Sequence, residues 1–362
     1  AYAPAADAAE WDVRVGGYME QFVAYADSDV ETVDDTDYAG VDSKQDAEIH
    51  FRPSITLDNG IRIGAQVELE ANTSGDQIDE SYMFISGSFG EVNLGSENSA
   101  GYKMTYGAPD VTFLNVNSGS TTAFVPYSGN TSGVNVGDDI FRGTLGSTFI
   151  ENTRNNDAQR ITYYSPRFAG VQLGFSYARD GNEDSNAQVD CDVTACNILD
   201  FGANYVQSFG DFDVAVSGRY GVIADGDFDD NPTIFGAGLN VGFAGVTVGG
   251  SFAEQNNAGT DDGQAYDAGI SYETGPWGFS FTYFKGENVD DENPTNINGN
   301  DEELAQYLVG ASYALAKGVS LSAFGAYVDF QEDNGDAALN VGESQGDDVD
   351  GFIVGTGIKI SF

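Results

Sequence analysis

The final twelve residues, 351–362, place the strongest constraint on what this chain can fold into. Successive side chains of a β-strand point to opposite faces, and one face here is apolar and free of charge: Phe352, Val354, Thr356, Ile358, Ile360 and Phe362. The other face is small or polar and carries Lys359. This pattern is typical of a strand in a soluble core, or of a strand with one side in lipid and the other in water.

Composition narrows the class of protein. Of 362 residues, 47 are glycine, roughly twice the average share, and aromatic residues reach 12%, which favours strands over helices. With 14 Lys and Arg against 58 Asp and Glu, the net charge is −44. Nucleic acid is thereby excluded as a partner, because phosphate contacts need cationic side chains. Such acidity is also typical of a surface adapted to high salt.

The sequence has no pattern typical of a spanning helix or an export signal. No run approaches the roughly 18 apolar residues that a spanning helix needs. No basic region followed by an apolar one opens the chain. If the chain is exported, we therefore expect this to be its mature form.

Tight-turn signals recur along the chain, each flanked by two alternating segments of about ten residues, the span of a tilted transmembrane strand. Asn-Gly is the strongest short hairpin signal, and glycine elsewhere supplies a positive φ. The turns are expected at 58–60, 88–90, 168–170, 209–211, 243–245, 274–276 and 316–318. Long polar connections are expected at 28–44, 72–78, 98–157, 181–197, 224–231, 256–263, 287–302 and 332–349.

Counting these elements predicts a closed barrel. Seven hairpins give fourteen strands, and an opening strand at 11–25 and a closing strand at 351–362 make sixteen. An even number lets both ends meet and leaves no open edge. We therefore predict an all-β fold in which residues 1–362 form one domain, a 16-stranded antiparallel transmembrane β-barrel.

The alternation within single strands favours this barrel over a soluble sandwich. Residues 46–57 and 61–70 each place apolar side chains on one face and nearly all charges on the other. A lipid-facing Arg or Lys costs about 2–4 kcal/mol at the bilayer midplane. The second face is small and polar, which is consistent with a watery lumen. Pro53 lacks the amide that a sheet without edges needs, and a local bulge is expected there.

One connection, 98–157, is about forty residues longer than the rhythm requires. A structureless stretch of that length is unusual unless it has a function. It is too apolar for a solvated loop, with Tyr102, Tyr106, Phe113, Leu114, Phe124, Phe141 and Phe149. Folding it into the lumen would bury these side chains and narrow the channel.

The chain resembles the general diffusion porins of Gram-negative outer membranes, of the alphaproteobacterial type. The resemblance is strongest at residues 79–82, 87–95, 106–111 and 160–170 and at the terminal Phe362, and the strand–turn rhythm extends it across nearly the whole chain. It implies a sixteen-stranded barrel, a homotrimer, an inward-folded third loop and recognition of Phe362 by the outer-membrane assembly machinery. It also implies outer-membrane localisation beside lipid and lipopolysaccharide.

In that family, carboxylates of the third loop face a basic cluster across the constriction. We expect Asp110, Asp138 and Asp139 on the loop, opposite Arg14, Arg52, Arg62 and Lys359, which share the lumen parity of four adjacent strands. We also expect His50, Glu48, Glu68 and Arg160 to face the lumen. The alternative is that each basic residue merely pairs with a neighbouring Asp or Glu. Basic residues are scarce for this family, so the cationic wall is expected to be thin.

Other chemistry finds little support in the sequence. His50 is the one histidine, and no nucleophile–histidine arrangement surrounds it, so no enzyme and no resident cofactor are expected. Acidic runs at 225–230, 290–292 and 346–348 are best interpreted as solvated charge, although acidic loops could bind Ca²⁺ through several carboxylates. Cys191 and Cys196, five residues apart, are expected to form a disulfide in an oxidising compartment.

The resulting hypothesis is a passive porin for small hydrophilic solutes and ions. Because like charge repels anions and concentrates cations, we expect cation preference. Two alternatives remain open: a substrate-specific channel of the same architecture, and a secreted acidic β-protein acting as an adhesin or lectin.

Overall fold

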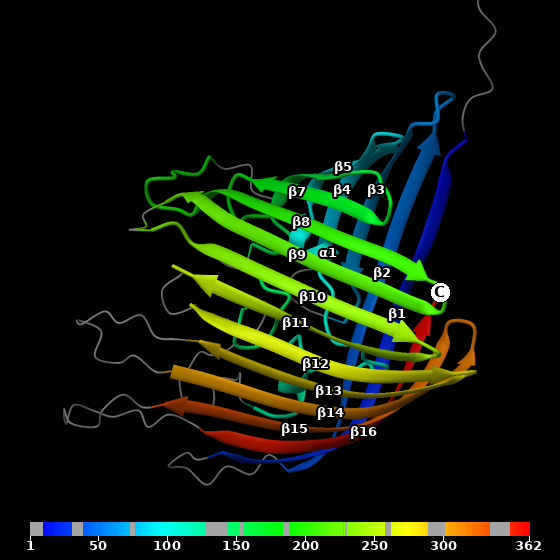
Figure 1. Cartoon of the computed structure of the whole chain (residues 1–362), viewed down its shortest axis with the longest axis vertical. Coiled ribbons are helices and arrows are strands. Elements are labelled where there is room, and N and C mark those ends of the chain that lie inside the picture. The colour runs from blue at the N-terminus through cyan, green and yellow to red at the C-terminus, as the bar shows by residue number, and fades with distance from the viewer. Residues whose placement is uncertain are drawn as a thin grey trace, which may run out of the picture.

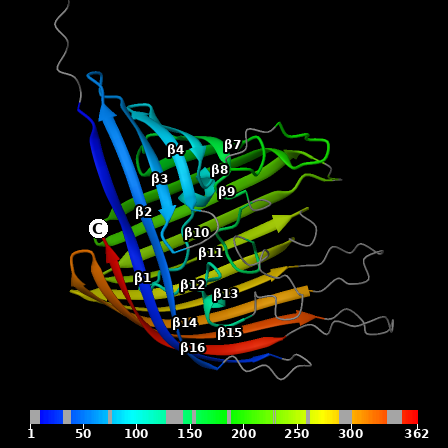
Figure 2. The same cartoon turned by 180° about the vertical axis from the view of Figure 1, so that it is seen from behind.

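The computed structural model describes residues 10–30, 39–72, 77–126, 143–151, 155–183, 188–226, 228, 230–257, 262–288, 301–333 and 348–362. Over these residues the strands close into a barrel in which each strand pairs antiparallel with its neighbours in the chain, and β1 pairs with β16 (Figures 1 and 2). The prediction of a 16-stranded antiparallel barrel is confirmed. Within the described residues, no helix combines the length and hydropathy needed to cross a bilayer.

The elements have the following bounds. The strands are β1 (Asp12–Val30), β2 (Gly40–Thr56), β3 (Arg62–Glu70), β4 (Ile78–Gly87), β5 (Gly90–Ser96), β6 (Gln159–Tyr164), β7 (Val171–Ala178), β8 (Cys196–Phe209), β9 (Phe212–Asp225), β10 (Thr233–Phe243), β11 (Val246–Asn256), β12 (Gly263–Thr274), β13 (Trp277–Asn288), β14 (Asp301–Ala316), β15 (Val319–Asp333) and β16 (Val349–Ser361). In the described part of the chain between β5 and β6 lie two short helices, α1 (Ala100–Met104) and the 3₁₀ helix η1 (Ser120–Ala123).

Tight turns join the strands where the glycine signals predicted them. Gly90 has φ +111° and an added Cβ would lie 2.1 Å from the carbonyl oxygen of Tyr164. Gly318 has φ +72° and an added Cβ would lie 2.2 Å from the carbonyl oxygen of Ser361. A side chain is therefore excluded at both turns by conformation and by space.

The first two strands are longer than the sequence predicted. β1 has 19 residues and β2 has 17, whereas strands were expected at 11–25 and from residue 46. The added residues include the exposed, charged Asp29 and Asp42. Backbone pairing continues past the apolar band into a region where strand residues face water, so hydrophobicity does not mark the strand ends.

The outward face of the barrel is apolar and exposed, as the alternation predicted. Leu173, Val309 and Val354 are 55%, 59% and 58% exposed. The inward face, however, is not uniformly small and polar. Over β13–β16 it carries buried apolar side chains that include Phe284, Leu304, Leu308, Phe324 and Phe330. The expectation of a polar second face is wrong in this sector, because another part of the chain packs there.

The bulge expected at Pro53 is also wrong. Phe51 pairs with Val67 and Ser54 with Gly64, so the register of β2 against β3 is the same on both sides of the proline. Only the pairing of residues 52 and 53 with β3 is interrupted. The missing amide of Pro53 thus opens a gap in the ladder without shifting it.

Candidate functional site

The segment between β5 and β6 packs on inward-facing side chains of the barrel; residues 97–158 are called the inner segment below. Its α1 lies against β7, β8 and β9 (Figure 1). Several of its backbone amides bond to side chains on the wall, among them Gly101 N to Asp200 Oδ1 at 2.7 Å, Ala108 N to Asp267 Oδ2 at 2.8 Å and Tyr106 N to Ser217 Oγ at 2.9 Å. The described part of the inner segment is therefore held to the wall through its own backbone.

The first attachment is a buried ion cluster. Arg219 Nη2 of β9 lies 2.6 Å from Asp200 Oδ2 of β8 and 3.7 Å from Glu151 Oε2 of the inner segment. Arg219 also donates to the carbonyl of Ile150. An added Cβ on Gly101 would lie 2.0 Å from Asp200 Oδ1, so only glycine allows this approach. Both ends of the inner segment thus meet at one place on β8 and β9.

The second attachment involves two aspartates. Asp267 of β12 accepts hydrogen bonds from Ala108 N, from Asn117 Nδ2 at 2.5 Å and from Ser251 Oγ at 2.7 Å. Asp110 Oδ1 accepts from Thr112 N and from Ser280 Oγ of β13, both at 2.9 Å. Burial raises the pKa of Asp110, and its hydrogen bonds offset that only in part.

The third attachment is apolar. Phe113 meets Phe22 of β1 edge-on with ring centroids 6.4 Å apart. One buried cluster joins side chains of the inner segment to the apolar sector of the wall: Leu114, Val116, Phe124, Val125 and Leu145 with Phe284, Leu304, Leu308, Phe324 and Phe330 among others. This packing accounts for the apolar character at Phe113, Leu114 and Phe124, and Tyr102 contacts Phe149 edge-on with ring centroids 5.9 Å apart. Phe141 lies outside the described residues.

The four expected basic wall residues lie on the inward face of β1, β2, β3 and β16. Arg14 is directly opposite Arg52 in register and forms an ion pair with Asp12 at 2.7 Å. Arg52 and Arg62 lie over the ring of Phe84, at 5.1 and 5.3 Å from its centroid. Arg62 also donates to Ser54 Oγ at 3.0 Å.

Lys359 pairs with Glu20, its register partner on β1, and lies 5.8 Å from the ring centroid of Phe113. It is therefore the basic wall residue that borders the inner segment.

Among the described residues, no direct bond joins an expected acidic partner to this basic group. Asp110 bonds to Thr112 and Ser280, and in the described part of the chain no hydrogen bond or ion pair joins it to Arg14, Arg52, Arg62 or Lys359. Asp138 and Asp139 lie outside the described residues. The role of these aspartates at a constriction stays a prediction.

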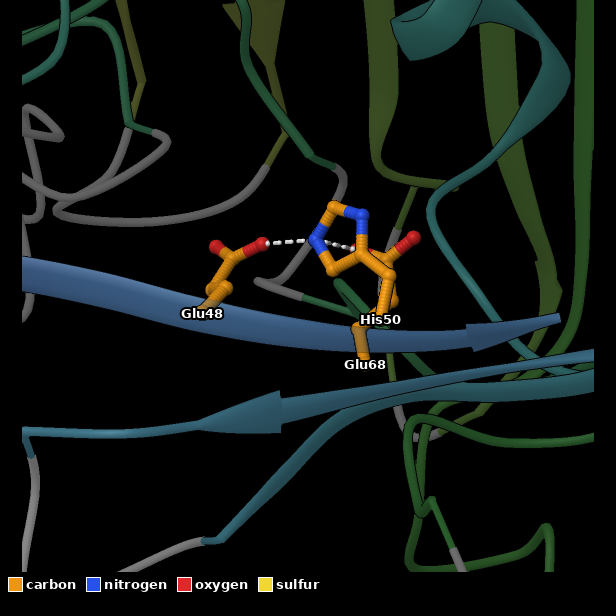
Figure 3. Close-up of side chains that lie close together, drawn as sticks. All are labelled: Glu48, His50 and Glu68. Carbon is orange, nitrogen blue, oxygen red and sulfur yellow. Dashed lines mark hydrogen bonds and ion pairs between the residues drawn. The ribbon is translucent and has the colours of Figure 1, made fainter. Parts of the chain in front are cut away.

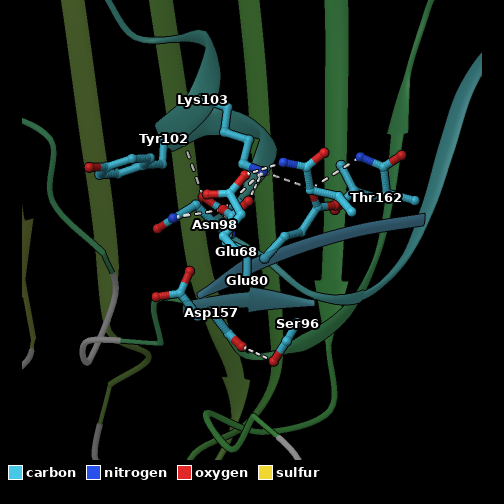
Figure 4. A network of polar contacts seen from close by, with 12 residues as sticks. Glu68, Glu80, Ser96, Asn98, Tyr102, Lys103, Asp157 and Thr162 are labelled. Carbon is cyan, nitrogen blue, oxygen red and sulfur yellow. Dashed lines mark hydrogen bonds and ion pairs between the residues drawn. The ribbon is translucent and has the colours of Figure 1, made fainter. Parts of the chain in front are cut away.

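A lysine that the sequence analysis missed brings a positive charge onto the inner segment. Lys103 Nζ of α1 lies 3.0 Å from Glu80 of β4 (Figure 4). It also lies 2.9 Å from Glu97 and 4.9 Å from the ring centroid of Tyr82. Burial alone would lower the pKa of Lys103, but the Glu97 and Glu80 carboxylates outweigh it and the pKa is raised. Here the cation lies on the inner segment and one of its two acids, Glu80, lies on the wall, the reverse of the expected arrangement.

Other predicted residues have structural surroundings. Arg160 has the expected inward parity but is buried and donates to the carbonyls of Ala158 and Asn155, so it does not line open lumen. Cys191 and Cys196 form a disulfide with a Cα–Cα distance of 5.5 Å. Phe362 pairs with Gly17 through its backbone amide and carbonyl, at 3.1 and 3.2 Å, and its side chain is exposed.

His50, Glu48 and Glu68 lie together on the inward face of β2 and β3 (Figure 3). His50 Nε2 lies 2.7 Å from Glu48 Oε2 and 3.8 Å from Glu68 Oε2. The predicted inward orientation of these three side chains agrees with the figure and with their partly buried state.

Comparison with known proteins agrees with this architecture. A family model described as Gram-negative porin matches residues 1–334. A porin of Rhodobacter capsulatus is 24% identical over 250 residues, covering 62% of this chain and 81% of the relative.

Two solved structures illustrate the likeness in fold. An anion-selective porin from Comamonas acidovorans is similar with a TM-score of 0.56 and 19% identity, over 98% of this chain and 100% of that one. A loop-deletion mutant of OmpT, an outer membrane protein of Vibrio cholerae, is similar with a TM-score of 0.61 and 14% identity, over 97% and 99%. The chain belongs to the Gram-negative porin family, and is an outer-membrane channel protein rather than an enzyme.

Proposed function

We propose that this chain is a passive diffusion channel for small hydrophilic solutes and ions, and that its narrowest cross-section lies between the inner segment and the wall of β1–β3. The observation that carries the proposal is that the aspartate contacts of the inner segment lie on one side of the barrel, whereas its contact with β1 is the apolar packing of Phe113 on Phe22. Asp200, Asp267 and Asp110 fix it to β8, β12 and β13. Arg52, Arg62 and His50 instead make their described contacts with other wall residues. The charged wall of β1–β3 therefore lies across the lumen from the strands to which these aspartates attach the inner segment.

We further propose that the channel prefers cations. The net charge is −44, and three basic groups near the lumen are neutralised by acids: Arg14 by Asp12, Lys359 by Glu20 and Lys103 by Glu80 and Glu97. Exposed charges are screened over about 8 Å at physiological salt, so the preference should weaken as salt rises. The Comamonas porin is described as anion-selective, but its identity to this chain is too low to carry selectivity across.

Reversal potentials test this selectivity. Purified protein in planar bilayers under a KCl gradient is expected to show cation preference that is strongest at low salt. Anion preference at low salt would contradict the proposal. A saturable conductance for one solute would instead favour the substrate-specific channel.

Assembly and surroundings are also proposals. The homotrimer is supported by family resemblance, and conductance steps in threes would test it. Contact of the acidic loops with lipopolysaccharide, with Ca²⁺ bridging carboxylates and phosphates, rests on charge; much of the runs at 290–292 and 346–348 lies outside the described residues. Loss of lipopolysaccharide binding on chelation, restored by Ca²⁺, is the expected result.

A further inference from the structure

We propose that Glu48, His50 and Glu68 form a binding site for a divalent transition-metal ion of the Zn²⁺ class on the channel wall. This goes beyond the proposed function, since a diffusion channel does not require a metal. One ligand atom from each side chain, a ring nitrogen of His50 and an oxygen of each glutamate, can be chosen so that all lie within 4.8 Å of one another. Figure 3 shows the three side chains converging from two neighbouring strands.

The backbone fixes where these ligands start. Glu48 and His50 are two residues apart on β2 and so share one face, and Glu68 is the register partner of His50 on β3. Directly opposite residues of antiparallel strands hold their Cβ atoms about 4.5–5.5 Å apart. The ligands therefore come from a hydrogen-bonded ladder rather than from loops, which favours a site whose geometry is formed before the ion arrives.

Neighbouring side chains orient the carboxylates. Tyr18 Oη donates to Glu48 Oε1 at 2.9 Å, and Gln66 Nε2 donates to Glu68 Oε1 at 2.6 Å. In each glutamate one oxygen is thus engaged, and the other oxygen, Oε2, is the one near His50 Nε2. Hydrogen bonds that orient metal-binding carboxylates in this way are a general property of metal sites.

The donor set selects the class of ion. One imidazole nitrogen and two carboxylate oxygens suit Zn²⁺ and related transition metals, whereas Ca²⁺ prefers six to eight oxygens. Bonds of about 2.0–2.2 Å to a tetrahedral Zn²⁺ place two donors about 3.3–3.6 Å apart, which lies between the observed distances of 2.7 and 3.8 Å from His50 Nε2. His50 remains 32% exposed, so water can complete the coordination.

A charged imidazole alone explains the cluster less well. Nε2 of a protonated histidine carries one hydrogen, which can donate a hydrogen bond to the Glu48 oxygen at 2.7 Å. That leaves the Glu68 oxygen at 3.8 Å without a hydrogen bond to the ring. A metal ion accounts for both carboxylates approaching the same nitrogen.

Metal binding can be measured directly because His50 is the one histidine of the chain. Protein purified in detergent without a histidine tag, with its histidine labelled, is titrated with ZnCl₂ in excess CaCl₂, which occupies the acidic loops. The expected result is saturable binding of one Zn²⁺ per chain, with a matching shift of the imidazole NMR signal. Binding without that shift would overturn the proposal, as would no saturable binding.

Three variants distinguish Zn²⁺ binding at this site from Zn²⁺ binding to other acidic parts of the chain. His50→Gln and Glu68→Gln are expected to weaken Zn²⁺ binding by roughly tenfold or more. Loss of a hydrogen bond that orients a ligand already costs about tenfold in metal affinity, and loss of the ligand itself should cost more. Asp46→Asn is the matched control: it removes one charge beside the site from a residue that accepts from Tyr18 but is outside the ligand set. Equal Zn²⁺ affinity in wild type and His50→Gln would mean binding to acidic loops only and would overturn the proposal.

Channel recordings add a functional measurement. Zn²⁺ added to the bath is expected to lower the single-channel conductance of wild type and of Asp46→Asn, but not of His50→Gln, because a bound dication reduces the local cation concentration. The same decrease in His50→Gln would contradict a site at this histidine. Binding in detergent does not depend on conduction, so failure of the metal site and failure of the channel proposal give different results.

Discussion

The two sides of the barrel interior use their charges differently. Beneath the inner segment, on β8, β9 and β12, charged side chains are buried and bonded to that segment: Asp200, Arg219 and Asp267 are 4%, 3% and 5% exposed. On β1–β3, Arg14 and Arg52 are exposed and contact other wall residues. The covered side holds the segment in place, and the open side leaves charge available to passing ions. Substitutions on the covered side should therefore change stability first, and those on the open side should change selectivity first.

The largest effect is expected from Asp200→Ala. It leaves Arg219 buried without its closest acid and removes the acceptor of the Gly101 amide. Breaking a buried ion pair on one side costs about 3–5 kcal/mol. We expect a clear fall in the thermal unfolding temperature in detergent, and larger, noisier channel currents as the inner segment loosens. Asp213→Ala, an exposed aspartate on β9 bonded to Ser208, is the control and should behave as wild type. Equal behaviour of the two variants would contradict the anchoring role.

A smaller loss of stability is expected from Lys103→Met. It leaves the fully buried Glu97 and the nearby Glu80 without their cation. Hydrogen bonds to charged groups contribute about 1.5–3 kcal/mol, and the result should appear as a lower unfolding temperature. Lys44→Met is the matched control, because Lys44 and Asp42 form an exposed pair and such pairs contribute little. A larger destabilisation by the control would be evidence against the inner-segment lysine as a structural cation.

On the open side, Arg52→Ala should change selectivity with little effect on stability. Arg52 is exposed and contacts the Phe84 ring rather than a carboxylate. A unit charge 4 Å from an ion changes its energy by about 1 kcal/mol in water, so cation preference should rise by up to about fivefold at low salt. Arg14→Ala, whose charge is already offset by Asp12, should give a smaller rise. An unchanged permeability ratio in Arg52→Ala would exclude this residue from the narrow part.

The fold was predictable from sequence because period-two alternation and glycine turns are local signals. The strands over 160–178 show this: the apolar side chains of Ile161, Tyr163 and Leu173 alternate along the outward face and are exposed, and the glycine turn predicted at 168–170 falls between the two strands. The strand ends were less predictable, since β1 and β2 continue into water where composition no longer distinguishes strand from loop.

The site was predicted less completely because its contacts join residues far apart in the chain. Asp110 was identified by its motif, but its partner Ser280 is 170 residues away, and nothing local indicates that pairing. The ion pair of Asp200 and Arg219 could have been predicted from the sequence, because both residues have inward parity on neighbouring strands. The sequences of β14 and β15 carry apolar residues on both faces, which is the pattern of a strand buried on both sides. This pattern could have predicted that the inward face of these strands is covered.

The smallest effect is expected at Asp110, and it tests the pH dependence of the covered side. Burial raises the pKa of Asp110 above its unfolded value, so the folded state favours the protonated carboxyl. Ionising the buried Asp110 carboxyl therefore lowers the stability of the folded state. This loss is absent below the pKa of Asp110 in the unfolded chain, grows as the pH rises from that pKa to the higher pKa of the folded state, and stays constant above both. Asp110→Asn removes this cost while keeping an oxygen that can accept from Ser280. Its unfolding temperature relative to wild type should therefore be higher at pH 7 than at pH 3, and unfolding measured across that range checks the slope. A difference that stays constant or reverses would show that Asp110 is ionised without penalty, as expected only if water reaches it.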